Sequence, residues 1–141
     1  IGLYGYNNYL SKELVPVHSL KSVIAQIINC NKGESVGYNR SFFCKNDMMV
    51  GVIPIGHADG ISRFFSKNAH VFISGRKAEV LGNICMDVLM VNLNGLNCDE
   101  GDEVVLFDSK NNAEDFAKSV GTISYEILTN LSSRIERKII R

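Results

Sequence analysis

The chain has 141 residues, of which 45% are hydrophobic and 21% are charged. This composition is typical of one globular domain with a sizeable core, and it excludes an intrinsically disordered segment. Fifteen basic residues balance fifteen acidic ones, so no net field would attract nucleic acid or an anionic membrane surface.

Cysteine spacing and hydropathy indicate the compartment. The chain has no C-x-x-C pair, and its four cysteines are far apart: Cys30, Cys44, Cys85 and Cys98. We therefore expect reduced thiols, with neither a disulfide frame nor a metal site. No apolar run approaches the ~20 residues that cross a bilayer, and no charged-then-apolar leader is present. These features favour a cytoplasmic protein. The start I-G-L-Y-G-Y, without Met, suggests a piece of a longer chain.

The first part of the chain predicts short strands separated by turns. Residues 1–14 show no clean period, and we expect them to be a connector. The β-branched run Val15–Cys30 predicts a strand, with Pro16 confined to its start or to a sheet edge. After the turn N-K-G-E-S, the segment Val36–Phe43 predicts a second short strand, and Met48–Ile55 predicts a central one.

The stretch Val50–Arg63, V-G-V-I-P-I-G-H-A-D-G-I-S-R, is the most informative. A short apolar run closed by glycines predicts a buried strand that ends in a loop bearing His57, Asp59 and Arg63. Ionisable side chains on a loop held by a rigid strand are typical of functional sites. In the commoner alternative, the loop is a tight turn in which Asp59 accepts backbone N–H bonds and His57 is solvated.

The second part predicts more strands and then two helices. The predicted strands are Ala69–Ser74, Ala78–Leu81, Val88–Leu93 and Asp102–Phe107, with a polar break at Gly82–Asp87. Asn112–Val120 has an Asn cap, an acidic first turn and Gly121 after its end, which predicts a helix. A second helix is expected around Tyr125–Leu131, and the tail Ser133–Arg141 alternates like an edge strand. We predict a mainly β, barrel-like domain of about six or more strands with two short helices near the C-terminus.

Four separated segments resemble the C-terminal domain of alanine racemase, in the same order and at similar spacing. They are V-G-Y-N-R-S-F, I-P-I-G-H-A-D-G-I-S-R, G-N-I-C-M-D and T-I-S-Y-E-I-L-T-N-L-S-S-R-I-E-R. The opening I-G-L-Y-G resembles the end of that family's barrel, and L-K-S-V-I-A-Q resembles its first β-domain strand. The resemblance covers essentially the whole chain. It implies that residues 15–141 form the β domain and that residues 1–14 lead from an N-terminal (β/α)8 barrel.

The resemblance implies a two-domain, fold-III enzyme that uses pyridoxal 5′-phosphate held on a lysine of the barrel. Such enzymes interconvert L- and D-alanine for peptidoglycan synthesis. Two subunits pack head to tail as a homodimer, so that each β domain faces its partner's barrel. The lysine is absent from this β-domain segment, and we expect the segment alone to be inactive. Some racemases are fused to a cell-wall ligase, and the sequence leaves the parent's domain order open.

The resemblance also implies roles for individual residues. Tyr38 would be one of two bases on opposite faces of the substrate, acting in the partner's site while the cofactor is the electron sink. A free tyrosine titrates near ~10, so a base at neutral pH needs nearby cations or hydrogen bonds. Met86 and Asp87 match the loop that binds the substrate carboxylate through a pre-organised backbone N–H. Tyr125, near a helix start, matches a tyrosine that contacts the cofactor phosphate.

Three residues match the substrate entrance. Arg63 corresponds to a basic residue of the channel. His57 stands where many members have tyrosine, and a histidine side chain can gain charge between pH 5 and 8. Asn83 stands where many members have arginine, so the entrance channel of this protein would carry one positive charge fewer. We expect altered substrate access with the chemistry retained, and we expect Asp59 to fix its own loop.

A purely structural role is the alternative for several of these residues. They are a packed strand tyrosine at Tyr38, a core methionine beside a turn aspartate at Met86 and Asp87, a surface cap at Tyr125, and a solvated charge at Arg63. For the whole chain, a basic amino-acid decarboxylase shares the fold type, but its C-D-G-type motif matches Cys98–Gly101 poorly. A non-enzymatic dimerisation or binding module is favoured if Tyr38 is buried away from any cleft.

Overall fold

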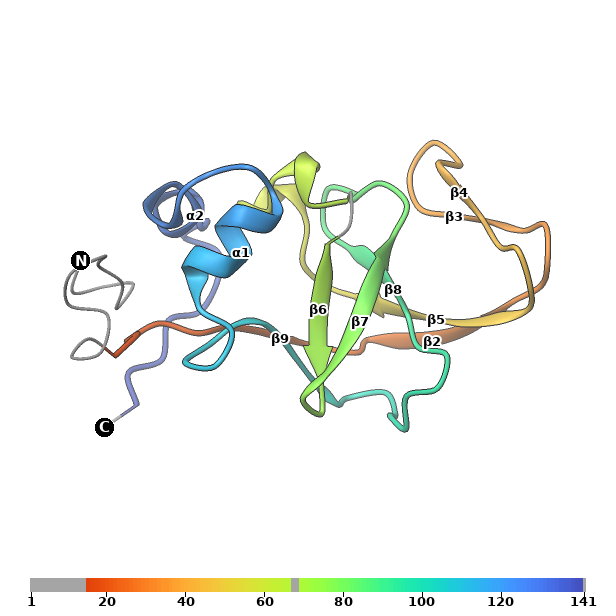
Figure 1. Ribbon diagram of the computed structural model, residues 1–141, viewed down its shortest axis with the longest axis horizontal. Helices are drawn as coiled ribbons and strands as arrows, with labels where there is room; N and C mark the ends of the chain where they lie inside the picture. Colours follow the sequence, from red (N-terminus) through yellow and green to blue (C-terminus); the bar gives the residue numbers. More distant parts are fainter. Residues whose placement is uncertain (1–14, 67–68, 141) are drawn as a thin grey trace.

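The computed structural model describes residues 15–66 and 69–140, and these form a curled antiparallel sheet with a small hairpin and two helices (Figure 1). The seven strands of the sheet, in spatial order, are β1 (Leu20–Val23), β9 (Glu103–Phe107), β6 (His70–Ile73), β7 (Arg76–Leu81), β8 (Leu89–Asn92), β5 (Met48–Ile53) and β2 (Gln26–Cys30). The other elements are the hairpin β3 (Ser35–Val36) and β4 (Phe42–Phe43), the helices α1 (Ala113–Ser119) and α2 (Ser124–Asn130), and the 3-10 turns η1 (His57–Asp59) and η2 (Arg63–Ser66). The predicted fold class is confirmed.

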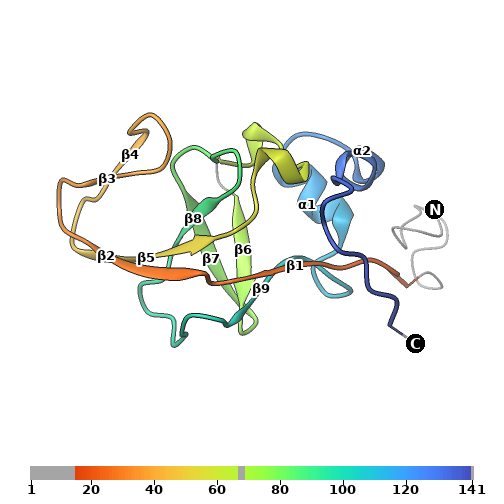
Figure 2. The same ribbon diagram turned by 180° about the vertical axis from the view of Figure 1, so that it is seen from behind.

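The sheet curls because β1 and β2 are consecutive in the chain yet stand at opposite ends of the strand order. Only Ile24 and Ala25 separate them. The Ile24 N–H donates to the Asp102 carbonyl at 3.0 Å, and the Ala25 N–H donates to the Val52 carbonyl at 2.9 Å. One nearly continuous run of chain therefore lies along both edges of the sheet (Figure 2). The prediction of a single strand over Val15–Cys30 is wrong, because the backbone changes its hydrogen-bond partner at Ile24.

The core lies inside the curl. Alternate residues of an antiparallel strand face one side of the sheet, and Val71, Ile73, Leu89 and Val91 are all buried there. Burial of each such side chain stabilises the fold by about 1.5–3 kcal/mol.

Helix α1 closes one end of this core. Its Phe116 ring lies 4.5 Å from Phe65 and 5.6 Å from Phe107, measured between ring centroids. Asn112 caps α1 as predicted, since its side chain accepts a hydrogen bond from the Asp115 N–H at 2.9 Å.

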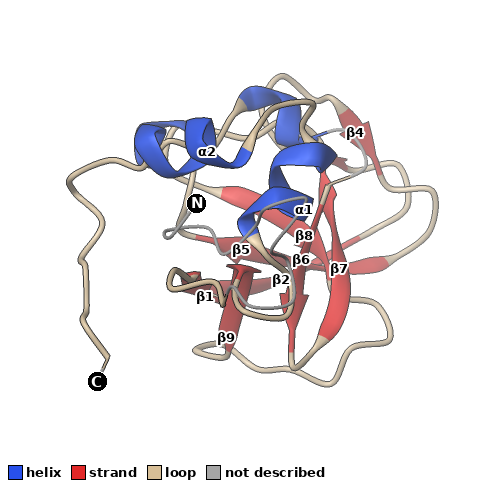
Figure 3. Ribbon diagram, turned by 60° about the vertical axis from the view of Figure 1, so that its left-hand side comes forward, coloured by secondary structure: helices blue, strands red, loops and turns tan. Residues whose placement is uncertain are grey.

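Two further strand predictions are wrong. Val36–Phe43 is interrupted, because Gly37, Asn39 and Arg40 adopt φ values of 81°, 59° and 51° that turn the chain between β3 and β4. The described part of the tail after α2 is an irregular loop and not an edge strand (Figure 3). The predicted connector, residues 1–14, lies outside the described residues. In the described ranges, every helix is too short to cross a lipid bilayer.

Candidate functional site

Three loops at one end of the sheet carry most of the predicted site residues, along the upper edge in Figure 1. The turn between β3 and β4 carries Tyr38, and η1 begins with His57. Residues 82–88, between β7 and β8, carry Asn83, Met86 and Asp87. This third segment, which we term the 82–88 loop, is hydrogen-bonded to both of the others.

The Tyr38 turn is attached to the 82–88 loop through Asn83. The Tyr38 N–H donates to the Asn83 carbonyl at 3.4 Å, and the Asn83 side-chain amide donates to the Tyr38 carbonyl at 3.3 Å. The Asn83 N–H donates to the Ser41 hydroxyl at 2.7 Å. Tyr38 nevertheless stays 65% exposed. The backbone of Tyr38 is thus held in place while its phenol remains accessible, which differs from a tyrosine packed in a strand.

Turn η1 is attached to the opposite side of the same loop. The His57 N–H donates to the Cys85 carbonyl at 3.1 Å, and the Ala58 N–H donates to the Met86 carbonyl at 2.8 Å. Met86 is 63% exposed, so it is not a core methionine. Its N–H donates to no acceptor among the described residues, and it is therefore available to an external ligand.

The His57 ring is half-buried and ordered by its own turn. Its Nδ1 atom lies 2.9 Å from the Ile61 carbonyl oxygen. Because a carbonyl only accepts, this contact requires the hydrogen to be on Nδ1. The alternative in which His57 is solvated is therefore wrong. The tight turn that this alternative also predicted, in which Asp59 accepts a backbone N–H bond, is present.

Asp59 is buried and fixes its own loop, as expected. Its Oδ2 accepts the Gly56 N–H at 2.8 Å, and its carboxylate forms a two-pronged pair with Arg134: Nε to Oδ1 at 2.7 Å and Nη2 to Oδ2 at 3.2 Å. Burial raises the pKa of Asp59, but the hydrogen bonds from Arg134 and Gly56 outweigh it and leave that pKa below its ordinary value. The same Arg134 Nη2 donates to Asp87 Oδ1 at 2.6 Å. Bonds to Asp59 and Asp87 raise the pKa of the guanidinium.

We expect Asp59→Asn to lower the free energy of unfolding at pH 7 by about 2 kcal/mol, because it weakens a charged hydrogen-bond set. A depressed carboxyl pKa gives stability that is complete above the unfolded value of about 3.9 and is lost as the pH falls through the folded pKa. The difference between the two proteins should therefore shrink under acid. Denaturation measured from pH 7 down to about pH 3 checks this, and a difference that is constant with pH contradicts it.

Tyr125 and Arg63 lie on two other elements. Tyr125 is the second residue of α2 and is 58% exposed, and Arg63 is the first residue of η2 and is also exposed. The segment just after α2 contacts the site, because the Ser132 N–H donates to the Asp59 carbonyl at 3.1 Å. The structure thus joins the loops of Tyr38, His57, Asn83, Met86 and Asp87 by hydrogen bonds, whereas Tyr125 and Arg63 lie outside these loops, on α2 and η2.

Sequence reasoning missed Arg134. It lies in S-S-R-I-E-R, which the alternating pattern assigned to an edge strand. No local motif marks its partners, since Asp59 and Asp87 are 75 and 47 residues away. The one available signal was indirect: two aspartates in loops that follow buried strands require a cation if either is buried.

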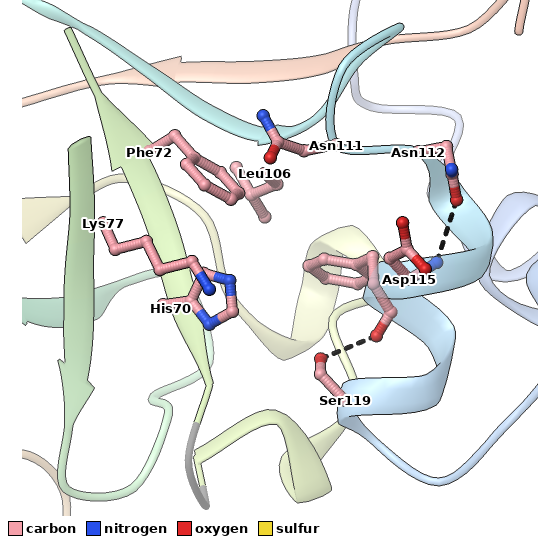
Figure 4. Close-up of a pocket in the computed structure, with 9 residues that line it drawn as sticks. His70, Phe72, Lys77, Leu106, Asn111, Asn112, Asp115 and Ser119 are labelled. Atoms are coloured by element: carbon pink, nitrogen blue, oxygen red, sulfur yellow. Dashed lines mark hydrogen bonds between the residues drawn. The ribbon is translucent and has the colours of Figure 1, made fainter. Parts of the chain in front are cut away.

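A separate pocket of about 250 Å³ lies between the sheet and α1 (Figure 4). Its walls are His70 and Phe72 of β6, Lys77 of β7, Leu106 of β9, Asn111, the cap residue Asn112, and Asp115, Phe116 and Ser119 of α1. None of the predicted site residues lines it. The candidate site is instead an exposed edge built from loops.

The family model described as "Alanine racemase, C-terminal domain" matches residues 17–139. An alanine racemase of Helicobacter pylori (strain G27) is 40% identical over 150 residues, which cover 99% of this chain and 40% of that protein. Alanine racemase 1 of Clostridium acetobutylicum is 38% identical over 149 residues, covering 99% of this chain and 39% of the relative. The chain thus spans about 40% of the length of these relatives.

Solved structures match as well. Alanine racemase from Bartonella henselae, with covalently bound pyridoxal phosphate, superposes with a TM-score of 0.91 at 31% identity, covering 99% of this chain and 40% of that one. Alanine racemase from Clostridium difficile 630, in complex with cycloserine, gives a TM-score of 0.84 at 37% identity, covering 94% and 37% of the two chains. Sequence and fold agree over nearly the full length, and the chain therefore belongs to the family of alanine racemase C-terminal domains.

Proposed function

We propose that this chain is the β domain of a pyridoxal-phosphate-dependent alanine racemase and that it contributes Tyr38 and the 82–88 loop to the active site of a partner subunit. The observation that carries the proposal is that Tyr38 and Met86 are both exposed and lie on loops that are hydrogen-bonded to each other. Tyr38 and Met86 are 65% and 63% exposed, yet the backbones of both loops are held by hydrogen bonds. Rigid loops with accessible polar groups suit a surface that is completed by another domain.

The chemistry requires little from this chain beyond two groups. When bound, pyridoxal phosphate would stabilise negative charge at the α-carbon of the amino acid. The Tyr38 phenol oxygen would take the α-proton as a phenolate, or return one as a phenol, on one face of the substrate, and the opposite base would lie outside this chain. The Met86 N–H would bind the substrate carboxylate, a role that suits a backbone donor because it is fixed and uncharged.

Tyr125 fits the cofactor phosphate by chemistry. Its hydroxyl can donate a hydrogen bond to a phosphate oxygen, and the residue is 58% exposed at the start of α2. We propose that the lysine that anchors the cofactor and most of its other contacts belong to an N-terminal (β/α)8 barrel reached through residues 1–14. A head-to-tail homodimer would then bring each β domain to its partner's barrel.

An assay of the full-length parent tests this proposal. We expect the parent, supplied with pyridoxal phosphate, to convert L-alanine to D-alanine and the reverse, and we expect residues 1–141 alone to do neither. Circular dichroism of D- and L-alanine mixtures measures both directions. A parent that binds no cofactor and racemises no amino acid contradicts the proposal and favours a non-enzymatic binding module.

The entrance residue His57 gives a second expected result. We expect His57→Tyr in the parent to change kcat/KM for alanine by more than about twofold, because the substitution removes the Nδ1 contact to the Ile61 carbonyl and alters entrance electrostatics. Steady-state kinetics in both directions measure it. A kcat/KM within about twofold of wild type would show that position 57 does not affect access.

A further inference from the structure

We propose that Arg134 is a positioning residue that holds the Met86 backbone N–H in its carboxylate-binding orientation and neutralises the acidic groups beside it. This inference rests on the proposed function, since it concerns the same substrate contact. Arg134 lies after α2, outside the three loops of the candidate site, and it acts through Asp59 and Asp87.

The first argument is geometric. One guanidinium is bonded to two carboxylates on different loops: Asp59 at the end of η1 and Asp87 on the 82–88 loop. Those loops are otherwise joined by two backbone bonds, from the His57 and Ala58 N–H groups to the Cys85 and Met86 carbonyls. The two peptide units on either side of Met86, the first of which contains the Met86 N–H, are therefore held from the η1 side. Because Arg134 also binds the next residue, Asp87, it limits rotation of the loop about Met86.

The second argument is electrostatic. Asp87 is adjacent to Met86 in the chain. Asp59 is paired with the same guanidinium, that of Arg134, as Asp87. With Arg134 in place, the three charges sum to one negative charge. Without it, two carboxylates would face an incoming carboxylate, and like charges at close range oppose binding. Loss of Arg134 should therefore weaken substrate binding more than it slows the proton transfer at Tyr38.

The surroundings of the Asp59–Arg134 ion pair favour a functional role over that of an ordinary surface ion pair. The Asp59 side chain is 9% exposed, and Arg134 reaches it with two bonds. Ordinary exposed ion pairs contribute little, but a bidentate guanidinium contact to a buried carboxylate fixes direction as well as distance. The Arg134 side chain itself is 48% exposed, so it is not a packing element of the core.

The test uses the full-length enzyme with Arg134→Gln, and with Arg137→Gln as a matched control. Arg137 lies in the same tail but, among the described residues, binds only the backbone carbonyls of Leu131, Ser132 and Ile135. We expect Arg134→Gln to raise KM for alanine and the inhibition constant of propionate by about tenfold, with kcat within about twofold. Hydrogen exchange at the His57 and Ala58 amides should accelerate. Arg137→Gln should leave all of these values unchanged.

Two more variants separate positioning from general stabilisation. In the Arg134→Gln background, Asp87→Asn removes an uncompensated carboxylate, and it should recover part of the lost affinity for propionate. Arg134→Lys keeps the charge without the two-pronged contact, so its KM should lie between those of wild type and Arg134→Gln. It also provides the same measurements if Arg134→Gln does not fold.

An unchanged KM and propionate constant in both Arg134 variants would overturn the inference. So would an equal response in Arg137→Gln, or no recovery with Asp87→Asn. If the wild-type parent does not racemise alanine, the proposed function is wrong. Faster hydrogen exchange at the His57 and Ala58 amides in Arg134→Gln would then still show that Arg134 holds η1 against the 82–88 loop.

Discussion

Tyr38→Phe in the full-length parent is expected, on the proposed function, to reduce racemisation of alanine by about 10²–10⁴-fold, the usual contribution of a positioned acid–base group. The substitution removes one oxygen from a residue that is 65% exposed, and it leaves intact the bonds that join the Tyr38 backbone to Asn83. Folding should therefore be unaffected. Solvent-deuterium incorporation into L- and D-alanine, measured separately, shows which face of the substrate has lost its base.

Tyr125→Phe is the matched control, because it makes the same chemical change at another exposed tyrosine. We expect it to weaken binding of pyridoxal phosphate while deuterium exchange at saturating cofactor stays near wild type. If L-alanine still acquires deuterium at close to the wild-type rate in Tyr38→Phe, the assignment of Tyr38 as a base is wrong.

Gly60→Ala is expected to destabilise the domain by about 3 kcal/mol, the sum of backbone strain and a steric clash. Gly60 has a φ of 97°, and an added Cβ would overlap the carbonyl oxygen of Asn130 at the end of α2 and approach the Leu131 Cα to 3.0 Å. Helix α2 would have to move away from η1, which breaks the bond from the Ser132 N–H to the Asp59 carbonyl. Chemical denaturation and exchange at the Ser132 amide measure the two effects.

Gly95→Ala isolates the backbone component of that loss. Gly95 has a φ of 75°, and its added Cβ would meet no atom within 4 Å. We expect a loss of about 1 kcal/mol there, and no change in exchange at Ser132. Equal losses at the two glycines would show that the packing of α2 on η1 is looser than the structure indicates.

Local signals in the chain were sufficient for much of the fold. The hairpin of β6 and β7, strand β9 and the Asn112 cap were predicted because each depends on neighbouring residues: alternation, a turn, or one side chain close to a helix start. The identity of the family also followed from sequence, since its motifs lie within short segments. The loop role of Asp59 was predicted for the same reason, because Gly56 is three residues away.

Contacts between distant segments could not be read in this way. The sequence determined which residues favour strands and turns, and it determined the family to which the chain belongs. Only the tertiary structure decided that the chain changes sheet edge at Ile24, that the tail is a loop, and that Arg134 joins Asp59 to Asp87. The physical reason is that strand pairing and ion pairs depend on which residues, remote in sequence, become neighbours when the sheet curls. No local sequence pattern encodes those neighbours.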